Sequence, residues 1–415
     1  MTRLEKQGTA AREAARQLVI LDTDTKNRAL SAIADALVVK SDLWLKANAL
    51  DLENARANGM KESMQDRLML NAERIKKIAG GVREAAALND PVGEIIEKFT
   101  RPNGLVIRKK RVPLGVIGII YEARPNVTVD AAALCLKSGN ACILRGGKEA
   151  INSNLAAVDI MRGAVASVGL NPDCISLVED TSRGSASELM HLDKYIDVLI
   201  PRGGAGLIRA VTREATVPVI RTGEGVCHVY IDAKANLDMG ANVLYNAKCS
   251  RPSVCNAAEC VIIHSGVLAP FLKKAVPLLK QKNVLLKADE RALKVLGSDA
   301  VAAEESDWDT EYNDYILAVK TVDSLDEAID FITLHGTSHS ESIITDDPAA
   351  AESFLNRVDA AAVYHNASTR FTDGGEFGLG AEIGISTQKL HARGPMGLEE
   401  LTSYKYTVSG TGQVR

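Results

Sequence analysis

The sequence predicts an α/β fold built from two domains with parallel β-sheets and one smaller β element. Its 415 residues correspond to two or three domains, at roughly 150 residues per domain. Short runs of β-branched residues alternate with Ala-rich stretches of helical spacing, which is typical of parallel sheets covered by helices. The hydrophobic content of 46% and the charged content of 25% are those of an ordinary globular protein, which excludes a disordered or fibrous chain.

The expected elements follow one another along the chain. Residues 1 to about 90 carry apolar residues three and four apart among Ala, Glu, Lys and Arg, which predicts a run of amphipathic helices. From Ile96, strand-like residues flank the turn Pro102-Asn103-Gly104, which predicts a projecting hairpin. Strands such as VPLGVIGIIYEA and ACILRGG then alternate with helices from Val112, and a second α/β unit follows Val229. The tail, ELTSYKYTVSGTGQVR, predicts one more strand.

Charge and cysteine content restrict the class of partner and compartment. Lys and Arg total 49 against 53 Asp and Glu, so the net charge of -4 offers no basic field for nucleic acid or for anionic lipid. Seven cysteines without a C-x-x-C pair indicate free thiols in a reducing compartment. The sequence has no apolar run of the roughly 18 residues that a membrane span requires. We therefore expect a cytoplasmic protein in which any anionic ligand needs a local site.

Two glycine-rich turns follow predicted strands and could bind phosphate. Arg145-Gly146-Gly147-Lys148 follows ACIL, and Pro201-Arg202-Gly203-Gly204 follows DVLI. A strand, a Gly-rich turn and a helix N-terminus expose backbone N–H groups to an anion. The other interpretation is an ordinary β–α turn with solvated charges, and either turn alone leaves both open. Neither turn matches G-x-G-x-x-G or a P-loop, so these two nucleotide-binding motifs are disfavoured.

Cys255 is a candidate nucleophile in the segment NAKCSRPSVCNAAECVII. A reactive thiol needs a nearby cation and an accessible approach, and Lys248 and Arg251 could supply the positive charge. The alternative is a buried structural cysteine, and position alone does not separate Cys255 from Cys249.

A histidine pair gives a weaker signal. His335 and His339 have the four-residue spacing of helical metal ligands, but Gly336 and the surrounding Ser and Thr indicate that the helix has ended. We expect hydrogen-bonding or loop roles for both histidines and no metal site.

Six segments in order resemble the aldehyde dehydrogenase superfamily, and the resemblance covers essentially the whole chain. They are VPLGVIGIIYEARP, SGNACILRGGKEA, IPRGGAG, RTGEGVCHVYID, NAKCSRPSVCNAAE and WDTEYND. The segments YEARPNVT, RPSVCNAAE and HARGPMGLEELTSYKY are similar to one branch of that superfamily. This resemblance implies an aldehyde dehydrogenase-like fold and an oxidoreductase of proline biosynthesis. Its reaction would be the NADPH-dependent reduction of L-glutamate 5-phosphate to L-glutamate 5-semialdehyde and phosphate, through a cysteine thioester.

The resemblance also implies a division of the chain. We expect a cofactor-binding domain over residues 1–96 and 113–226 and a catalytic domain over 227–395. The remaining ranges, 97–112 and 396–415, would form an oligomerisation hairpin and C-terminal strand, because open strand edges pair with another subunit. A homo-oligomer is therefore expected. Association with glutamate 5-kinase is a further expectation, because the acyl phosphate is labile and cyclises when released.

Carried over position by position, the resemblance makes Cys255 the nucleophile and its backbone N–H an oxyanion donor. Glu311 in TEYND would hold the nicotinamide ribose of bound NADPH or NADP+.

The same resemblance assigns the other cofactor contacts. Gly203 and Gly204 would face the pyrophosphate, and Arg145 would lie near the adenosine ribose. Lys148 stands where many NAD-using members have Glu, and a cation there would attract a 2′-phosphate.

Two departures from the wider superfamily affect the substrate site. The usual oxyanion-hole Asn is absent from its position before Pro, and Asn126 is the candidate substitute. Arg124 is expected to grip the phosphate of the substrate, and Arg221 and Arg251 to contact its carboxylate or phosphate. The general base of oxidising members is displaced, which suits a reductase, and Glu224 is the only Glu in that segment.

Two other hypotheses remain on the sequence alone. An NAD(P)-dependent aldehyde dehydrogenase could oxidise a small acidic semialdehyde without phosphate, and dependence of aldehyde oxidation on phosphate separates the two enzymes. A binding protein that lost turnover is the third hypothesis, against which the intact Cys255 and Glu311 argue.

Overall fold

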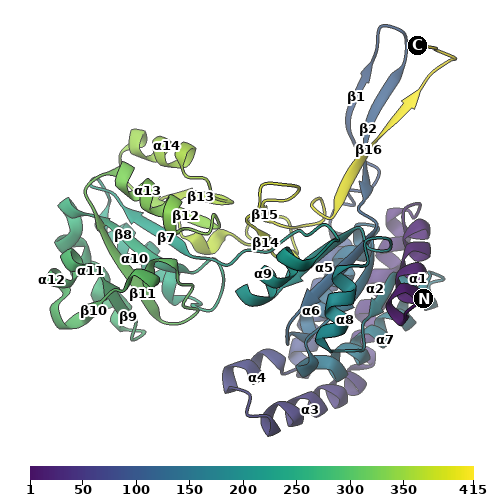
Figure 1. Ribbon diagram of the computed structural model, residues 1–415, viewed down its shortest axis with the longest axis horizontal. Coiled ribbons are helices and arrows are strands. Elements are labelled where there is room, and N and C mark those ends of the chain that lie inside the picture. The colour runs from purple at the N-terminus through teal and green to yellow at the C-terminus, as the bar shows by residue number, and fades with distance from the viewer. The chain divides into compact units, whose positions relative to one another are not determined.

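The computed structural model describes residues 1–415, except for the side chains of Ser63 and Ala205. The chain forms two compact units, which we call unit 1 and unit 2 (Figure 1). Unit 1 comprises Met1–Thr222, Gly378–Gly384 and Met396–Arg415, and unit 2 comprises Gly223–Phe377 and Ile385–Pro395. The expected α/β fold is confirmed, with parallel sheets and a small antiparallel sheet. The first division falls a few residues before the expected boundary after residue 226.

Unit 1 begins with the predicted run of helices. They are α1 (Arg3–Leu18), α2 (Thr23–Val39), α3 (Ser41–Ala57), α4 (Glu62–Leu68) and α5 (Ala72–Ala87). Side-chain caps start three of them: Thr2 caps α1 in a capping box with Glu5, Asp22 caps α2 and Asn71 caps α5. The apolar residues at helical spacing on α2 are buried, as the amphipathic pattern requires.

A four-stranded parallel sheet forms the centre of unit 1, in the order β5-β4-β3-β6. Its strands are β3 (Val116–Tyr121), β4 (Ala141–Arg145), β5 (Ile175–Leu177) and β6 (Val198–Arg202). The intervening helices are α6 (Pro125–Lys137), η1 (Lys148–Ala150), α7 (Ile151–Ser167), η2 (Pro172–Cys174), α8 (Arg183–Met190) and α9 (Ala205–Glu214). The chain adds β4 and β5 on one side of β3 and then β6 on the other. The strand order therefore reverses between β3 and β6, where open α/β sheets bind ligands.

The predicted hairpin and tail strand form one antiparallel sheet, β1-β2-β16. Its strands are β1 (Ile95–Thr100), β2 (Val106–Pro113) and β16 (Thr402–Ser409). The pairing of β16 with β2 runs without a break from Thr402 opposite Pro113 to Ser409 opposite Val106. In Figure 1 these strands form a ribbon that extends away from the parallel sheet of unit 1. All six residues of β1 are exposed, so this strand has an open edge.

Unit 2 is a second parallel sheet, in the order β10-β9-β11-β8-β7-β12-β13. Its strands are β7 (Cys227–Ile231), β8 (Ala258–His264), β9 (Leu285–Ala288), β10 (Ala300–Ala302), β11 (Ile316–Val322), β12 (Ser340–Ile344) and β13 (Ala362–His365). Its helices are α10 (Leu237–Cys249), η3 (Ser265–Val267), α11 (Leu268–Lys280), α12 (Glu290–Leu296), η4 (Gly297–Asp299), η5 (Glu305–Asp309), α13 (Leu325–His335), α14 (Pro348–Arg357) and η6 (Thr369–Phe371). A two-stranded antiparallel pair, β14 (Ile385–Ser386) and β15 (Gly394–Pro395), completes the unit.

Two cores cover the two faces of the unit 2 sheet. Val229 and Ile231 of β7 face the core that contains α10 and α11, whereas Tyr230 faces the core that contains α13 and α14. This alternation explains the continuous apolar run of the sequence, because a strand buried on both faces needs apolar residues at every position. No helix among the described residues is long and apolar enough to cross a lipid bilayer.

Asp51 of α3 fixes the start of α7, directly after the Gly146-Gly147 turn. Its buried carboxylate accepts hydrogen bonds from the backbone N–H groups of Asn152 (3.2 Å) and Ser153 (2.8 Å). It also accepts from Asn152 Nδ2 at 2.8 Å and Ser153 Oγ at 2.6 Å. The carboxylate therefore satisfies amide donors that a helix start leaves without intrahelical partners.

We predict that Asp51→Ala lowers the free energy of unfolding by about 2–4 kcal/mol, because it leaves several buried donors unpaired. Urea unfolding followed by circular dichroism measures the effect. Glu53→Ala, an exposed position on the same helix, is the matched control and should change stability by less than about 0.5 kcal/mol. Equal effects of the two substitutions would contradict the anchoring role of Asp51.

Candidate functional site

The candidate cofactor turns of unit 1 lie together at one edge of its sheet. They follow β3, β4 and β6, whose carboxyl ends meet at the same edge because all three strands are parallel. The structure thus brings the Glu122–Asn126 segment, the Arg145–Lys148 turn and the Gly203-Gly204 turn to one side of the sheet. This edge includes the point between β3 and β6 where the strand order reverses.

The Gly203-Gly204 turn is shaped for close approach by an anion. Gly204 is the N-cap of α9, and its backbone N–H donates to Glu122 Oε1 at 3.2 Å. A Cβ built on Gly203 would lie 2.7 Å from the carboxyl carbon of Glu122, so a side chain there would require the exposed Glu122 side chain to move. The N–H of Gly204 is thus directed at a negatively charged oxygen, and the expected role of the turn in binding a pyrophosphate stays a prediction.

Arg145 and Lys148 differ in how they are held. Arg145 Nη2 donates to the carbonyl oxygens of Thr181 (2.7 Å) and Ser182 (3.0 Å), so its guanidinium secures the loop between β5 and α8. Burial lowers the pKa of Arg145, while the charge of Asp180 opposes this shift. Lys148 begins η1 and is exposed. The Lys148 side chain is thus accessible to a ligand at this edge, and Arg145 serves mainly to shape the turn.

Arg124 and Asn126 follow β3. Arg124 is exposed and is the N-cap of α6, whose first residue is Pro125. The side chain of Asn126 donates from Nδ2 to Asp130 Oδ2 at 3.0 Å, one turn further along α6. Burial raises the pKa of Asp130 to about 6, although this hydrogen bond opposes the shift. The expected role of Asn126 as an oxyanion donor stays a prediction, as does the role of Arg124.

Cys255 is the accessible thiol of the chain. It precedes β8 and is partly exposed, whereas the other six cysteines are buried. Burial raises the pKa of Cys249 to about 11, which keeps that thiol protonated near neutral pH. The structure therefore separates two cysteines that the sequence could not distinguish.

The backbone of Cys255 is closely contacted by the segment that leads into β7. A Cβ built on Gly225 would overlap the carbonyl oxygen of Cys255 and lie 2.9 Å from its Cα. The thiol of the buried Cys227 donates to the same carbonyl oxygen at 3.2 Å. Gly225 in turn donates its N–H to Glu311 Oε1 at 3.1 Å. These contacts bring Cys255 and Glu311, both candidates from the sequence, into one cluster within unit 2.

A buried ion pair lies close to Glu311. Lys248 Nζ contacts Glu259 Oε2 at 2.5 Å, and both side chains are buried. Burial raises the pKa of Glu259 and lowers that of Lys248, and the charge of each partner opposes the shift of the other. The pair as a whole is neutral, so Lys248 supplies no net positive charge to the thiol, contrary to the expectation from the sequence.

The sequence did not single out Arg370 and Asn256, which hold the nucleophile segment from the other side. Arg370 Nε donates to Ser250 Oγ at 3.1 Å, and its Nη1 donates to Asn256 Oδ1. Asn256 Nδ2 donates to the carbonyl oxygen of Thr372 at 2.9 Å. The available signal was a lone Arg in the polar run NASTRFTDGG after a strand, but more than a hundred residues separate it from Cys255.

The remaining predicted residues have diverse positions. Arg251 is exposed in unit 2, Arg221 is exposed near the end of the first segment of unit 1, and Glu224 is half-buried.

His335 ends α13 and its Nδ1 contacts Asp309 at 2.8 Å. His339 is buried beside Ser340, and burial lowers its pKa to about 4. Within the part of the chain that the structure describes, three His, Cys, Asp or Glu side chains nowhere gather as metal ligands.

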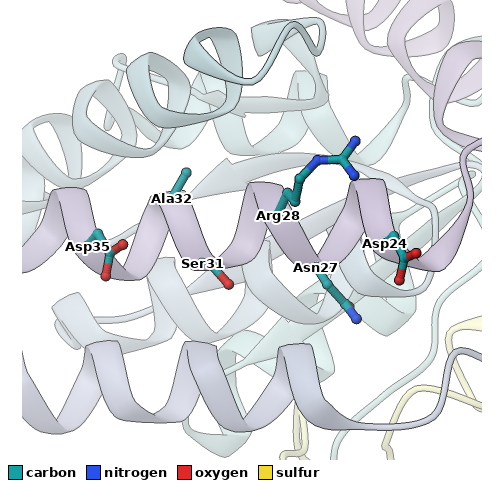
Figure 2. Close-up of a pocket in the computed structure, with 6 residues that line it drawn as sticks. All are labelled: Asp24, Asn27, Arg28, Ser31, Ala32 and Asp35. Carbon is teal, nitrogen blue, oxygen red and sulfur yellow. The ribbon is translucent and has the colours of Figure 1, made fainter.

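A hollow on α2 is a poor candidate site (Figure 2). Asn27 accepts a hydrogen bond from Lys137 at 2.7 Å, and Asp35 pairs with Arg83 at 2.6 Å. These two polar groups in the lining of the hollow thus already have partners within unit 1. The lining residues are Asp24, Asn27, Arg28, Ser31, Ala32 and Asp35.

Comparisons with known proteins show the family of the chain. The aldehyde dehydrogenase family matches residues 2–294. A gamma-glutamyl phosphate reductase of Enterococcus faecalis is 57% identical over 415 residues, covering 100% of this chain and 99% of the relative. The protein of that name from Lachnospira eligens is 55% identical and covers 100% of both chains. The crystal structure of gamma-glutamyl phosphate reductase from Thermotoga maritima superimposes with a TM-score of 0.98 at 46% identity, covering 100% of both chains.

The chain therefore belongs to the aldehyde dehydrogenase family, whose members are oxidoreductases that use a nicotinamide cofactor. Within that family, its full-length relatives are gamma-glutamyl phosphate reductases, enzymes of proline biosynthesis. The resemblance inferred from the six sequence segments is confirmed.

We predict that Gly225→Ala reduces turnover at least about 100-fold, because the added methyl group displaces the Cys255 carbonyl by ångströms. Steady-state kinetics measures the loss. Gly81→Ala, in α5 with open space around the new Cβ, is the control and should retain turnover. Full activity of Gly225→Ala would show that the close approach to Cys255 is not required.

Proposed function

We propose that this protein catalyses the NADPH-dependent reduction of L-glutamate 5-phosphate to L-glutamate 5-semialdehyde, with release of phosphate. The observation that carries the proposal is the cluster of Cys255, Gly225 and Glu311 in unit 2 of a chain whose full-length relatives bear the name of this activity. Unit 1 would bind the cofactor, and unit 2 would carry the covalent chemistry.

In the proposed mechanism, the Cys255 thiolate attacks the acyl carbon and its backbone N–H stabilises the developing oxyanion. The C–O bond to phosphate breaks and leaves a thioester on Cys255. NADPH, when bound, would supply the hydride for this thioester carbon. The resulting thiohemiacetal on Cys255 would lose its hydroxyl proton and release the aldehyde, with the sulfur leaving as a thiolate. Asn126 is the candidate second oxyanion donor. Glu224 is a candidate neighbour of the reacting centre.

The cofactor contacts are assigned residue by residue. We assign the pyrophosphate to the Gly203-Gly204 turn and the nicotinamide ribose to Glu311, whose carboxylate Gly225 anchors. Lys148, exposed at the edge of the unit 1 sheet, would attract the 2′-phosphate of NADPH, and Arg145 would shape the turn beside it.

The substrate has negative charges at both ends, so several arginines are candidates for binding it. We assign the phosphate to Arg124, whose guanidinium can donate two parallel hydrogen bonds. Arg221 and Arg251, both exposed, are candidates for the carboxylate or the phosphate.

The β1-β2-β16 sheet would join subunits into a homo-oligomer. Phe99, Tyr404, Tyr406 and Val408 expose apolar side chains on it. We place the activity in the cytoplasm, where the seven free cysteines remain reduced. Association with glutamate 5-kinase would shorten the lifetime of the free acyl phosphate.

The reverse reaction tests the proposed function. Purified protein with glutamate semialdehyde and NADP+ should form NADPH, followed by its absorbance, only when inorganic phosphate is present. Phosphate-independent NADPH formation would instead indicate a hydrolytic aldehyde dehydrogenase.

Cys255→Ala should lose turnover by at least about 1,000-fold and keep its affinity for NADPH within about twofold, measured by fluorescence titration.

We predict that Lys148→Glu raises the KM for NADPH about tenfold or more and changes the KM for NADH much less, because the carboxylate repels the 2′-phosphate. Steady-state kinetics with both cofactors measures the ratio. Lys194→Glu is the control, because this exposed lysine precedes β6, at the opposite edge of the sheet. Equal losses for both cofactors would remove Lys148 from 2′-phosphate recognition.

A further inference from the structure

We propose that Arg370 and Arg251 form an oxyanion subsite beside Cys255, which holds an anionic group of the substrate. The group is either the phosphate or the α-carboxylate of the acyl phosphate. The inference rests on the proposed function and adds to it a residue, Arg370, more than a hundred positions away from the nucleophile in sequence.

The position of the Arg370 guanidinium is fixed by the residue next to the nucleophile. Its Nη1 donates to Asn256 Oδ1, and its Nε donates to Ser250 Oγ at 3.1 Å. Asn256 is itself clamped, because its Nδ2 donates to the Thr372 carbonyl at 2.9 Å and its carbonyl oxygen accepts from Thr369 Oγ1 at 2.7 Å. The η6 segment thus ties Arg370 to the backbone that carries Cys255.

The partners of Arg370 leave its positive charge largely uncompensated. Asn256 and Ser250 are neutral, and Nη2 takes part in none of the hydrogen bonds of the described residues. Asp373 is the nearby carboxylate, and its Oδ1 accepts from the backbone N–H of Gly375 at 2.9 Å. A half-buried guanidinium without an ion-pair partner is a donor set suited to an incoming anion.

Arg251 adds a second positive charge at the same place. Burial lowers the pKa of Arg370, the charge of Arg251 lowers it further, and Asp373 and Cys255 oppose the shift. Two guanidinium groups that repel each other near the nucleophile would both be stabilised by one bound oxyanion. The acyl phosphate carries such oxyanions, so binding there would place its acyl carbon near the thiol and discriminate against uncharged aldehydes.

Paired alkylation of Cys255 tests the subsite without relying on turnover. Iodoacetate and iodoacetamide react with the same thiolate, but only iodoacetate carries a carboxylate. We expect the ratio of iodoacetate to iodoacetamide rate constants, measured by mass spectrometry of the Cys255 peptide, to fall about tenfold in Arg370→Gln. Arg370→Lys, which keeps a charge but not the planar fork, should retain part of the ratio. An unchanged ratio in Arg370→Gln would overturn the proposal.

Matched variants separate this subsite from a merely structural role. Arg357→Gln, an exposed arginine of unit 2 that pairs with Asp326, should leave the ratio unchanged. Arg251→Gln, at an exposed position where folding is not at risk, should also lower the ratio. Should Arg370→Gln fail to fold, an unchanged ratio in Arg251→Gln would overturn the proposal. A structural effect alone would slow both reagents equally and keep the ratio.

Protection experiments on the unmodified protein identify the anion. Inorganic phosphate that slows iodoacetate, against chloride at equal ionic strength, assigns the subsite to the phosphate. Glutamate that protects when phosphate does not assigns it to the α-carboxylate, and absence of protection by both overturns the subsite. Phosphate-dependent NADPH formation by the unmodified protein is measured separately. Its absence would refute the proposed function, whatever the alkylation ratio.

Discussion

Contacts from two directions hold the backbone of Cys255, the proposed nucleophile. Gly225 lies so close to the Cys255 carbonyl that no side chain fits between them, and the Cys227 thiol donates to the same oxygen. The next residue, Asn256, is clamped by the η6 segment from the opposite direction. A thiolate that must attack one carbon cannot tolerate displacements of an ångström, so this packing is a precondition for the chemistry of the site.

The same glycine links Cys255 to Glu311, the residue proposed to hold the nicotinamide ribose. Gly225 contacts the Cys255 carbonyl with its Cα face and donates its N–H to Glu311. The buried pair of Lys248 and Glu259 joins α10 to β8 in this region. Removing one member of such a pair leaves the other buried without its partner, which is destabilising.

Unit 1 uses a simpler principle. Its glycine-rich turn and its exposed cation lie at the carboxyl edge of a parallel sheet, where amide donors of β–α turns point in one direction. The two cations of this turn differ in accessibility. Arg145 donates to backbone carbonyls, whereas the side chain of Lys148 is exposed. Under the proposed function, anion binding would belong to the turns of unit 1 and covalent chemistry to the packed backbone cluster of unit 2.

Local patterns in the sequence determined the classes of element and their order. The helical spacing of residues 1–90, the Pro102-Asn103-Gly104 turn and the β-branched runs each reflect interactions between near neighbours, which a sequence displays directly. The ordered motifs also identified the family and proposed Cys255 and Glu311.

Only the tertiary structure decided how residues far apart in sequence meet. It distinguished Cys255 from Cys249 by burial, placed Glu259 beside Lys248, and brought Arg370 to the nucleophile segment. Burial, charge compensation and hydrogen bonding across more than a hundred residues depend on packing between elements. No local pattern encodes that packing, because the folded chain as a whole sets the surroundings of each side chain.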